Sequence, residues 1–264
     1  MKKELIISTV FSGLTKTKFL AENCYLTTGI RSTIVCQLFE VDIKNYQNEY
    51  TPAYDIIYSL DKGLARSRML GILSSSADLV WITDDDIEVI PQGAIAAFKE
   101  IELSNDDFIT TKYAVSENTE RKKYSTSEFI HSRVSIMKVS SIEIIINRNK
   151  ILNKGIAFDT RFGLGAIYKS GEENIFLADI LRKGGKGRFL PIITSIHRDL
   201  TSGGDFTSNT ANFAKGAIFR RVFSFSGIPL LIAFYIKRLL KKEVELARFF
   251  TSLTSSFKGF FKLK

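Results

Sequence analysis

Three consecutive aspartates, Asp84, Asp85 and Asp86, form the strongest candidate cation site in this sequence. They directly follow the apolar run 79–83, which is short, has no turn residue and is typical of a buried strand. Carboxylates at the end of a strand lie at the sheet edge where open α/β folds bind ligands. Three crowded anions repel one another unless a cation screens them, and Mg²⁺ or Mn²⁺ often bridges carboxylates to substrate phosphates. The cluster therefore indicates a site for a metal and a diphosphate, although a solvated acidic turn capping the helix after Pro91 explains it equally well locally.

A second acidic motif, the pair Glu172 and Glu173, follows Gly171 and opens a predicted helix over 172–182. A carboxylate that faces a cleft can take the proton of an acceptor hydroxyl as general base. Adjacent side chains on a helix point about 100° apart, so we expect only one of the two in that role. Both acids could instead simply complement the helix dipole.

Basic residues gather in the segment 61–68, where Gly63 precedes a predicted helix. The start of a helix offers backbone N–H groups to an anion. Arg66 and Arg68 do not share a helix face, so we expect one to reach a diphosphate and the other to pair with an acid. An ordinary cationic helix start explains the same residues.

One of the two histidines, His197, follows the strand-like run 188–196. Imidazole can ligate a divalent metal. A histidine that is only hydrogen-bonded fits this position at least as well.

Strand-like and helix-like segments alternate over residues 1–115, which predicts an α/β fold with a mostly parallel sheet and helices on both faces. A further strand is expected over 141–147, and the basic run 121–123 is expected in a solvated loop. The polar segment 201–210 is a candidate mobile loop. The alternating part predicts strands over 5–10, 33–39, 55–59, 79–83 and 108–115 and helices over 16–28, 63–75 and 91–103.

The net charge of +9 is confined to the end of the chain, because residues 215–264 hold 11 basic residues and two acidic ones. Basic residues spread over the whole chain would indicate nucleic acid, so we expect no nucleic-acid partner. A neutral body of 1–214 with a basic, aromatic, helical tail of 215–264 indicates an anionic lipid surface. Two cysteines without metal spacing fit a reducing compartment, and the amino terminus has no features of a signal peptide.

The tail contains an uninterrupted apolar run over 228–236, whereas a spanning helix needs about 20 apolar residues. Basic residues flank this run on both sides. We therefore expect an in-plane segment that docks on the anionic inner face of the cell membrane. Packing of these helices on the body of residues 1–214 or on a second subunit explains the same pattern.

Taken in order, these pieces resemble a bacterial family 2 glycosyltransferase with the GT-A fold, over roughly residues 4–200. The similarity rests on two parts of the sequence, 63–68 followed by 84–86 and 158–166 followed by 171–174. The resemblance implies a nucleotide-sugar donor, commonly a UDP-sugar, and Mn²⁺ or Mg²⁺ as cofactor.

The resemblance also implies roles for the acidic residues. Asp84–Asp86 matches the DxD motif, with Asp86 in direct contact with the metal and Asp84 and Asp85 near the ribose and the sugar. Asp84 and His197 are further metal-ligand candidates. Glu172-Glu173 matches the family's acidic pair, whose second member is usually the base, so Glu173 is favoured and Glu172 is the alternative.

Four other residues are expected near the nucleotide. Thr9, Gln37 and Asp61 follow or end predicted strands where such enzymes hold the nucleoside. Arg66 falls where a basic side chain often meets the nucleotide.

The implied activity is an inverting, metal-dependent transfer to a glycan or lipid-linked glycan in surface polysaccharide or lipopolysaccharide assembly. The sugar, the acceptor hydroxyl and a homo-oligomeric state stay open. A sugar nucleotidyltransferase and a non-catalytic, membrane-associated nucleotide-binding scaffold are the alternatives.

Overall fold

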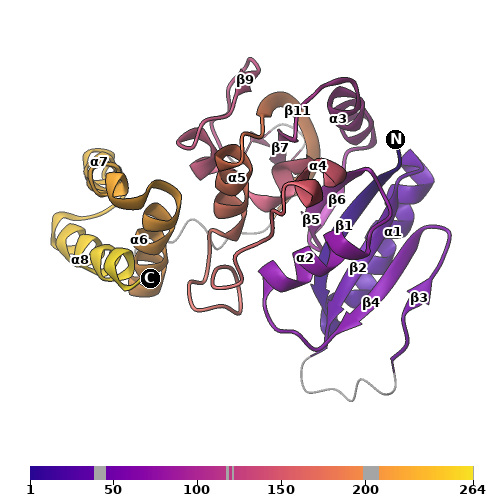
Figure 1. Ribbon diagram of the computed structural model, residues 1–264, viewed down its shortest axis with the longest axis horizontal. Coiled ribbons are helices and arrows are strands. Elements are labelled where there is room, and N and C mark those ends of the chain that lie inside the picture. Colours follow the sequence, from indigo (N-terminus) through magenta and orange to yellow (C-terminus); the bar gives the residue numbers. More distant parts are fainter. Residues whose placement is uncertain (39–45, 117–118, 121, 199–207, 264) are drawn as a thin grey trace.

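One mixed sheet forms the centre of the protein in the computed structural model, which describes residues 1–264 except 39–45, 117–118, 121, 199–207 and 264 (Figure 1). In this described part, the strand order is β3-β4-β2-β1-β5-β10-β7-β11-β6, with β8 beside β7 and β9 beside β11. The strands are β1 Lys3–Val10, β2 Arg31–Gln37, β3 Glu49–Tyr50, β4 Tyr54–Ser59, β5 Leu79–Asp84, β6 Ile87–Val89, β7 Phe108–Ser116, β8 Thr119–Glu120, β9 Phe129–Ile130, β10 Ile144–Asn147 and β11 Gly187–His197.

The first half of the sheet is parallel, because β4, β2, β1 and β5 run in one direction. The strand order reverses at β1, which lies between β2 and β5. In open α/β sheets such a reversal opens a crevice outside the carboxyl ends of the strands. Beyond β5, β10 is antiparallel to both β5 and β7, and β11 is parallel to β7.

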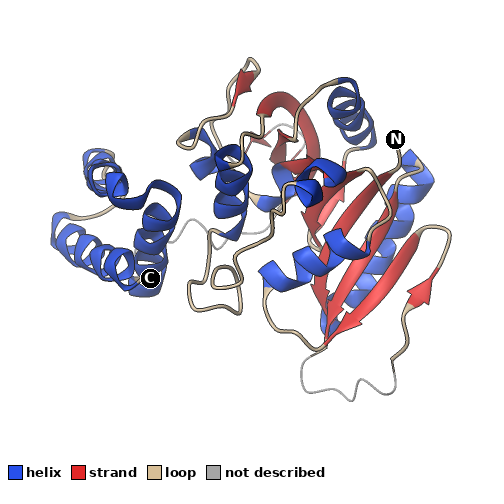
Figure 2. Ribbon diagram, viewed as in Figure 1, coloured by secondary structure: helices blue, strands red, loops and turns tan. Residues whose placement is uncertain are grey.

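Helices cover both faces of the sheet (Figure 2). Successive side chains of β1 point to opposite faces: Leu5 and Ile7 pack in one hydrophobic cluster with α1 and α3, and Ile6 packs in another with α2 and α5. The expected α/β architecture is therefore confirmed. The helices are α1 Leu14–Thr28, α2 Leu64–Ser74, α3 Pro91–Leu103, α4 Arg148–Asn153, α5 Glu172–Arg182, α6 Asn209–Phe223, α7 Gly227–Leu240 and α8 Leu246–Lys262.

The predicted helices over 91–103 and 172–182 are confirmed at both ends. The predicted strand over 141–147 is wrong in its first half, where the 3-10 turn η4 (Ser141–Glu143) precedes β10. Ser140 and Glu143 form a capping box there, in which each side chain accepts from the other residue's backbone N–H. A serine followed three residues later by a glutamate starts a helical turn, and this local preference outweighs the strand propensity of the isoleucines.

Three helices form a bundle at the carboxyl end of the chain (Figure 1). Close contact between α6 and α8 depends on glycine at two positions. A Cβ at Gly216 would lie 1.8 Å from the carbonyl oxygen of Ser256, and one at Gly259 would lie 1.9 Å from that of Phe213. The bundle therefore packs backbone against backbone, which no larger residue allows.

The bundle is also fixed to the α/β body through α6. Arg221 of α6 bonds to Asp159 at 3.1 Å and to Asp179 of α5 at 2.8 Å. The expected domain boundary between residues 214 and 215 falls inside α6. The helical unit therefore starts at Asn209, and α6 is part of the body as well as of the tail.

One stretch, Asn209–Leu240, is long and apolar enough to cross a membrane by length and composition alone. Of its apolar 18-residue segment, 39% is buried inside the protein. It is not one straight helix, because α6 ends at Phe223 and the chain turns at Ser224, where φ is +55°. Membrane docking of the tail stays a prediction. Most of the expected mobile loop over 201–210 lies outside the described residues, and α6 already starts at Asn209.

Candidate active site

A cleft of about 1280 Å³ opens at the carboxyl ends of β1 and β5. Its walls come from the strand ends, the starts of α2 and α5, the segment 134–142, and the helices α6 and α7. Pockets for one small ligand usually enclose roughly 300–1,000 Å³. The cleft is therefore larger than a typical pocket for one small ligand.

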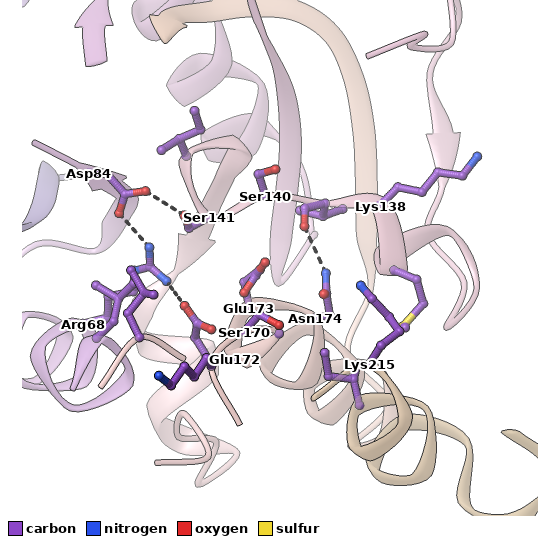
Figure 3. A pocket seen from close by; sticks show the side chains of 18 of the residues that line it. Arg68, Asp84, Lys138, Ser140, Ser141, Ser170, Glu172, Glu173, Asn174 and Lys215 are labelled. Carbon is purple, nitrogen blue, oxygen red and sulfur yellow. Dashed lines mark hydrogen bonds and ion pairs between the residues drawn. The ribbon is translucent and has the colours of Figure 1, made fainter. Parts of the chain in front are cut away.

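A buried arginine joins the two acidic motifs across this cleft (Figure 3). Arg68, only 1% exposed, bonds through Nη2 to Asp84 Oδ1 and through Nη1 to Glu172 Oε1, each at 2.6 Å. The hydroxyl of Ser141 donates to the other oxygen of Asp84 at 3.1 Å. Burying these charges is tolerable only because each has a bonded partner. Arg68 is thus the arginine that pairs with acids, as expected for one of the two.

Glu173 is the acid of the pair that points into the cavity, between Arg68 and Lys215 (Figure 3). Burial raises the pKa of Glu173 to about 8, and the neighbouring charge of Glu172 acts in the same direction. A carboxylate with a pKa near neutrality is suited to accept a proton from a hydroxyl. The geometry therefore separates the two glutamates: Glu172 holds Arg68, and Glu173 faces the space where a substrate would lie.

The last two aspartates have different partners. Asp85 accepts a hydrogen bond from the hydroxyl of Thr9, and burial raises the pKa of Asp85. Asp86 Oδ2 lies 3.0 Å from His197 Nε2, and this contact lowers the pKa of Asp86. The other oxygen, Asp86 Oδ1, is buried and has no hydrogen-bond partner within the described residues.

These residues fit a cation that is shared with a substrate. In the described part of the chain, no group of three or more His, Cys, Asp or Glu side chains is placed to hold a metal by itself. Mg²⁺ and Mn²⁺ commonly take only one or two carboxylates and complete their coordination with phosphate oxygens and water. Both oxygens of Asp84 are already bonded, so the unpartnered oxygen of Asp86 is the better ligand.

The structure brings only some of the expected nucleoside residues to the cleft. Thr9 and Gln37 line it, and the side-chain oxygen of Gln37 accepts from the backbone N–H of Gly63 at 2.9 Å. Asp61 and Arg66 do not line it; they lie 3.8 Å apart with side chains 71% and 53% exposed. Their assignment to the nucleotide stays a prediction.

The Gly-Leu-Gly sequence at 163–165 packs against the start of α2. The carbonyl of Leu164 accepts from the N–H of Leu64 at 2.9 Å, and a Cβ on Gly165 would lie 3.1 Å from the Cα of Gly63. Gly165 also has a φ of +83°, which favours glycine. The loop before α5 thus packs directly on the start of α2.

No protein-family model and no curated protein matches this chain. Crystal structures of S. aureus TarS residues 1–349, alone and with UDP, match it with a TM-score of 0.62 and 13% identity, over 98% of this chain and 81% of that one. The complex with UDP-GlcNAc matches with a TM-score of 0.66 and 12% identity. TarS is a glycosyltransferase. The chain therefore shares the fold of these TarS structures. At this identity the match shows the fold alone and leaves the family 2 assignment a prediction.

Two lysines that line the cleft were not identified by sequence reasoning. The expectation of a solvated loop over 121–123 is wrong for Lys122, whose ammonium donates to Ser140 Oγ at 2.8 Å and to Glu143 Oε1 at 3.0 Å. Lys215 lines the cleft from α6, far along the chain from both acidic motifs. No local spacing links Lys215 to the site, because its position follows from how the carboxyl-terminal helices pack.

Proposed function

We propose that this protein transfers a sugar from a UDP-sugar to a hydroxyl of a glycan or lipid-linked glycan, with inversion at the anomeric carbon. One observation carries the proposal: the aspartates at the end of β5 line the same cleft as Glu173, whose pKa is raised. The shared fold with TarS, which has been crystallised with UDP and with UDP-GlcNAc, supports a nucleotide-sugar donor.

In this mechanism, Glu173 accepts the proton of the acceptor hydroxyl as the oxygen attacks the anomeric carbon. The new carbon–oxygen bond forms on the face opposite the diphosphate, the bond to the diphosphate breaks, and UDP leaves. Asp86, held by His197, is the residue best placed to bind Mn²⁺ or Mg²⁺. When bound, the metal would offset the charge on the departing diphosphate.

Donor and metal binding can be tested together by thermal unfolding. Adding UDP with Mn²⁺ should raise the midpoint, since a ligand at 100 times its Kd adds about 2.7 kcal/mol to the free energy of unfolding. Asp86→Asn should lose the part of the shift that depends on Mn²⁺. Glu88→Gln, which changes an exposed acid two residues further on, should keep it.

The outcomes separate the two claims. An unchanged Mn²⁺ effect in Asp86→Asn would reject the metal role of Asp86. The absence of any shift with UDP would reject the donor class. Release of UDP that requires an acceptor would distinguish the transferase from a sugar nucleotidyltransferase and from a scaffold without activity.

The proposal also places the protein on the inner face of the cell membrane, through its basic tail. Phe250 and Phe261 of α8 are 63% and 62% exposed. Such side chains beside lysines and arginines suit the boundary between headgroups and acyl chains of an anionic leaflet.

Sedimentation with anionic vesicles tests this docking. The wild-type protein should pellet with them, and a Phe250→Glu, Phe261→Glu double variant should stay in the supernatant. Phe19→Glu, which changes an equally exposed phenylalanine on α1, is the control and should pellet like the wild type. Point variants are preferable to deleting residues 216–264, because that deletion removes most of α6 and hence part of the cleft wall. Equal pelleting of the double variant would reject the docking surface.

A further inference from the structure

The part of the cleft formed by α6 and α7 carries an excess of cations. The residues of α7 and its carboxyl end that line the cleft recur at helical spacing and so share one face of the helix. The amino-terminal half of this α7 face is apolar, and the carboxyl-terminal half is basic. These residues are Leu230, Phe234, Lys237, Arg238 and Lys241. Lys215 of α6 adds another cation to the same wall.

Two cations of this wall already have an acidic neighbour, because Arg238 pairs with Glu243 and Lys241 Nζ lies 3.9 Å from the same carboxylate. Most of the acids that line the cleft are bonded to other groups. Asp84 and Glu172 are taken by Arg68, and Asp86 contacts His197. In the part of the chain that the structure describes, no carboxylate forms an ion pair with Lys215 or Lys237.

Lys237 and Arg238 lie in the last turn of α7, where cations interact favourably with the negative end of the helix dipole. This interaction is enough to explain their positions. It does not explain Lys215, which lies in the middle of α6. Burial lowers the pKa of Lys215, with the charge of Glu173 acting in the opposite direction. Lys215 is half-buried, and its ammonium lies 5.8 Å from the centre of the Phe234 ring. An ammonium partly removed from water without a paired carboxylate favours an anionic ligand in the adjoining cleft.

We infer that the acceptor substrate carries a phosphate group, which Lys215 and Lys237 bind so that the acceptor hydroxyl reaches Glu173. This rests on the proposed transferase function and specifies its acceptor class. Lysine and arginine form charge-assisted hydrogen bonds to phosphate oxygens, and Leu230 and Phe234 lie next to them for an apolar substituent. The phosphate could belong to a lipid carrier or to a water-soluble phosphodiester, which share this chemistry.

The test first fills the donor half of the cleft by saturating the protein with UDP and Mn²⁺. Calorimetric titrations then compare glycerol 3-phosphate and hexyl phosphate with two uncharged probes, glycerol and hexyl glucoside. Both phosphates should bind and the uncharged probes should not. Lys215→Met and Lys237→Met should each weaken phosphate binding by about tenfold, which corresponds to about 1.4 kcal/mol.

Two controls keep the result interpretable. Lys99→Met, an exposed lysine on α3, should bind phosphate like the wild type. Lys237 is itself exposed, so its replacement should leave the fold intact, and Lys215→Arg should retain binding because it keeps the charge. Tighter binding of hexyl phosphate than of glycerol 3-phosphate would identify a lipid-linked source, and equal binding a water-soluble one.

Three results would overturn the inference: no phosphate binding to the UDP-loaded protein, wild-type affinity in both methionine variants, or competition between phosphate and UDP for one site. Each of these leaves the transferase proposal standing. If UDP itself does not bind, the proposed function fails before the acceptor is tested.

Discussion

Replacing Glu173 with glutamine is expected to lower turnover by about 10²- to 10⁴-fold while leaving UDP binding unchanged. Glutamine has nearly the same shape but cannot accept the hydroxyl proton. The side chain points into the cavity, whereas Glu172 is held by Arg68 and is not free to take over. Steady-state rates and UDP titrations on the same preparation would measure both quantities.

The pH dependence of the wild-type rate gives a second measure of the same residue. The pKa of Glu173 is raised to about 8, so the carboxylate is protonated and inactive as a base below that pH. The rate should therefore rise as the pH increases through that region, and the residual rate of Glu173→Gln should not. Glu100→Gln, an exposed glutamate on α3, should match the wild type in both respects. Full turnover in Glu173→Gln would refute the assignment of the base.

Replacing Arg68 with methionine is expected to lower the free energy of unfolding by about 3–5 kcal/mol. The change leaves Asp84 and Glu172 without the cation that bridges them in the interior, and an uncompensated buried charge is strongly destabilising. Unfolding in urea, followed by circular dichroism, would measure the loss. Arg66→Met on the same helix, whose side chain is 53% exposed, should change stability by no more than about 0.5 kcal/mol.

A combined variant tests the reason for this loss. Arg68→Met together with Asp84→Asn and Glu172→Gln removes all three charges, so it should be more stable than Arg68→Met alone. If the triple variant were no more stable, the loss would come from packing of the arginine side chain and not from its charge.

Local sequence was enough to predict the elements that carry the site. The run before Asp84 is apolar and lacks turn residues, so it predicts β5 and places the aspartates at its carboxyl end. Gly171 followed by two acids predicts the start of α5. These features depend on residues close together in the chain, where side-chain type and spacing decide the structure. The polar side chains at strand ends likewise indicated the edge of the sheet that forms the cleft.

Only the tertiary structure decided how these elements combine. Sequence reasoning left Glu172 and Glu173 as alternatives, because the contact that separates them joins Arg68 to a residue 104 positions away. The same holds for β10, which enters the sheet antiparallel between β5 and β7, and for Lys215, which reaches the cleft from a helix first assigned to a membrane tail. Periodicity and residue type report which face of an element is buried. They do not report which distant element covers that face, and in this protein that pairing sets the partner of each charged group.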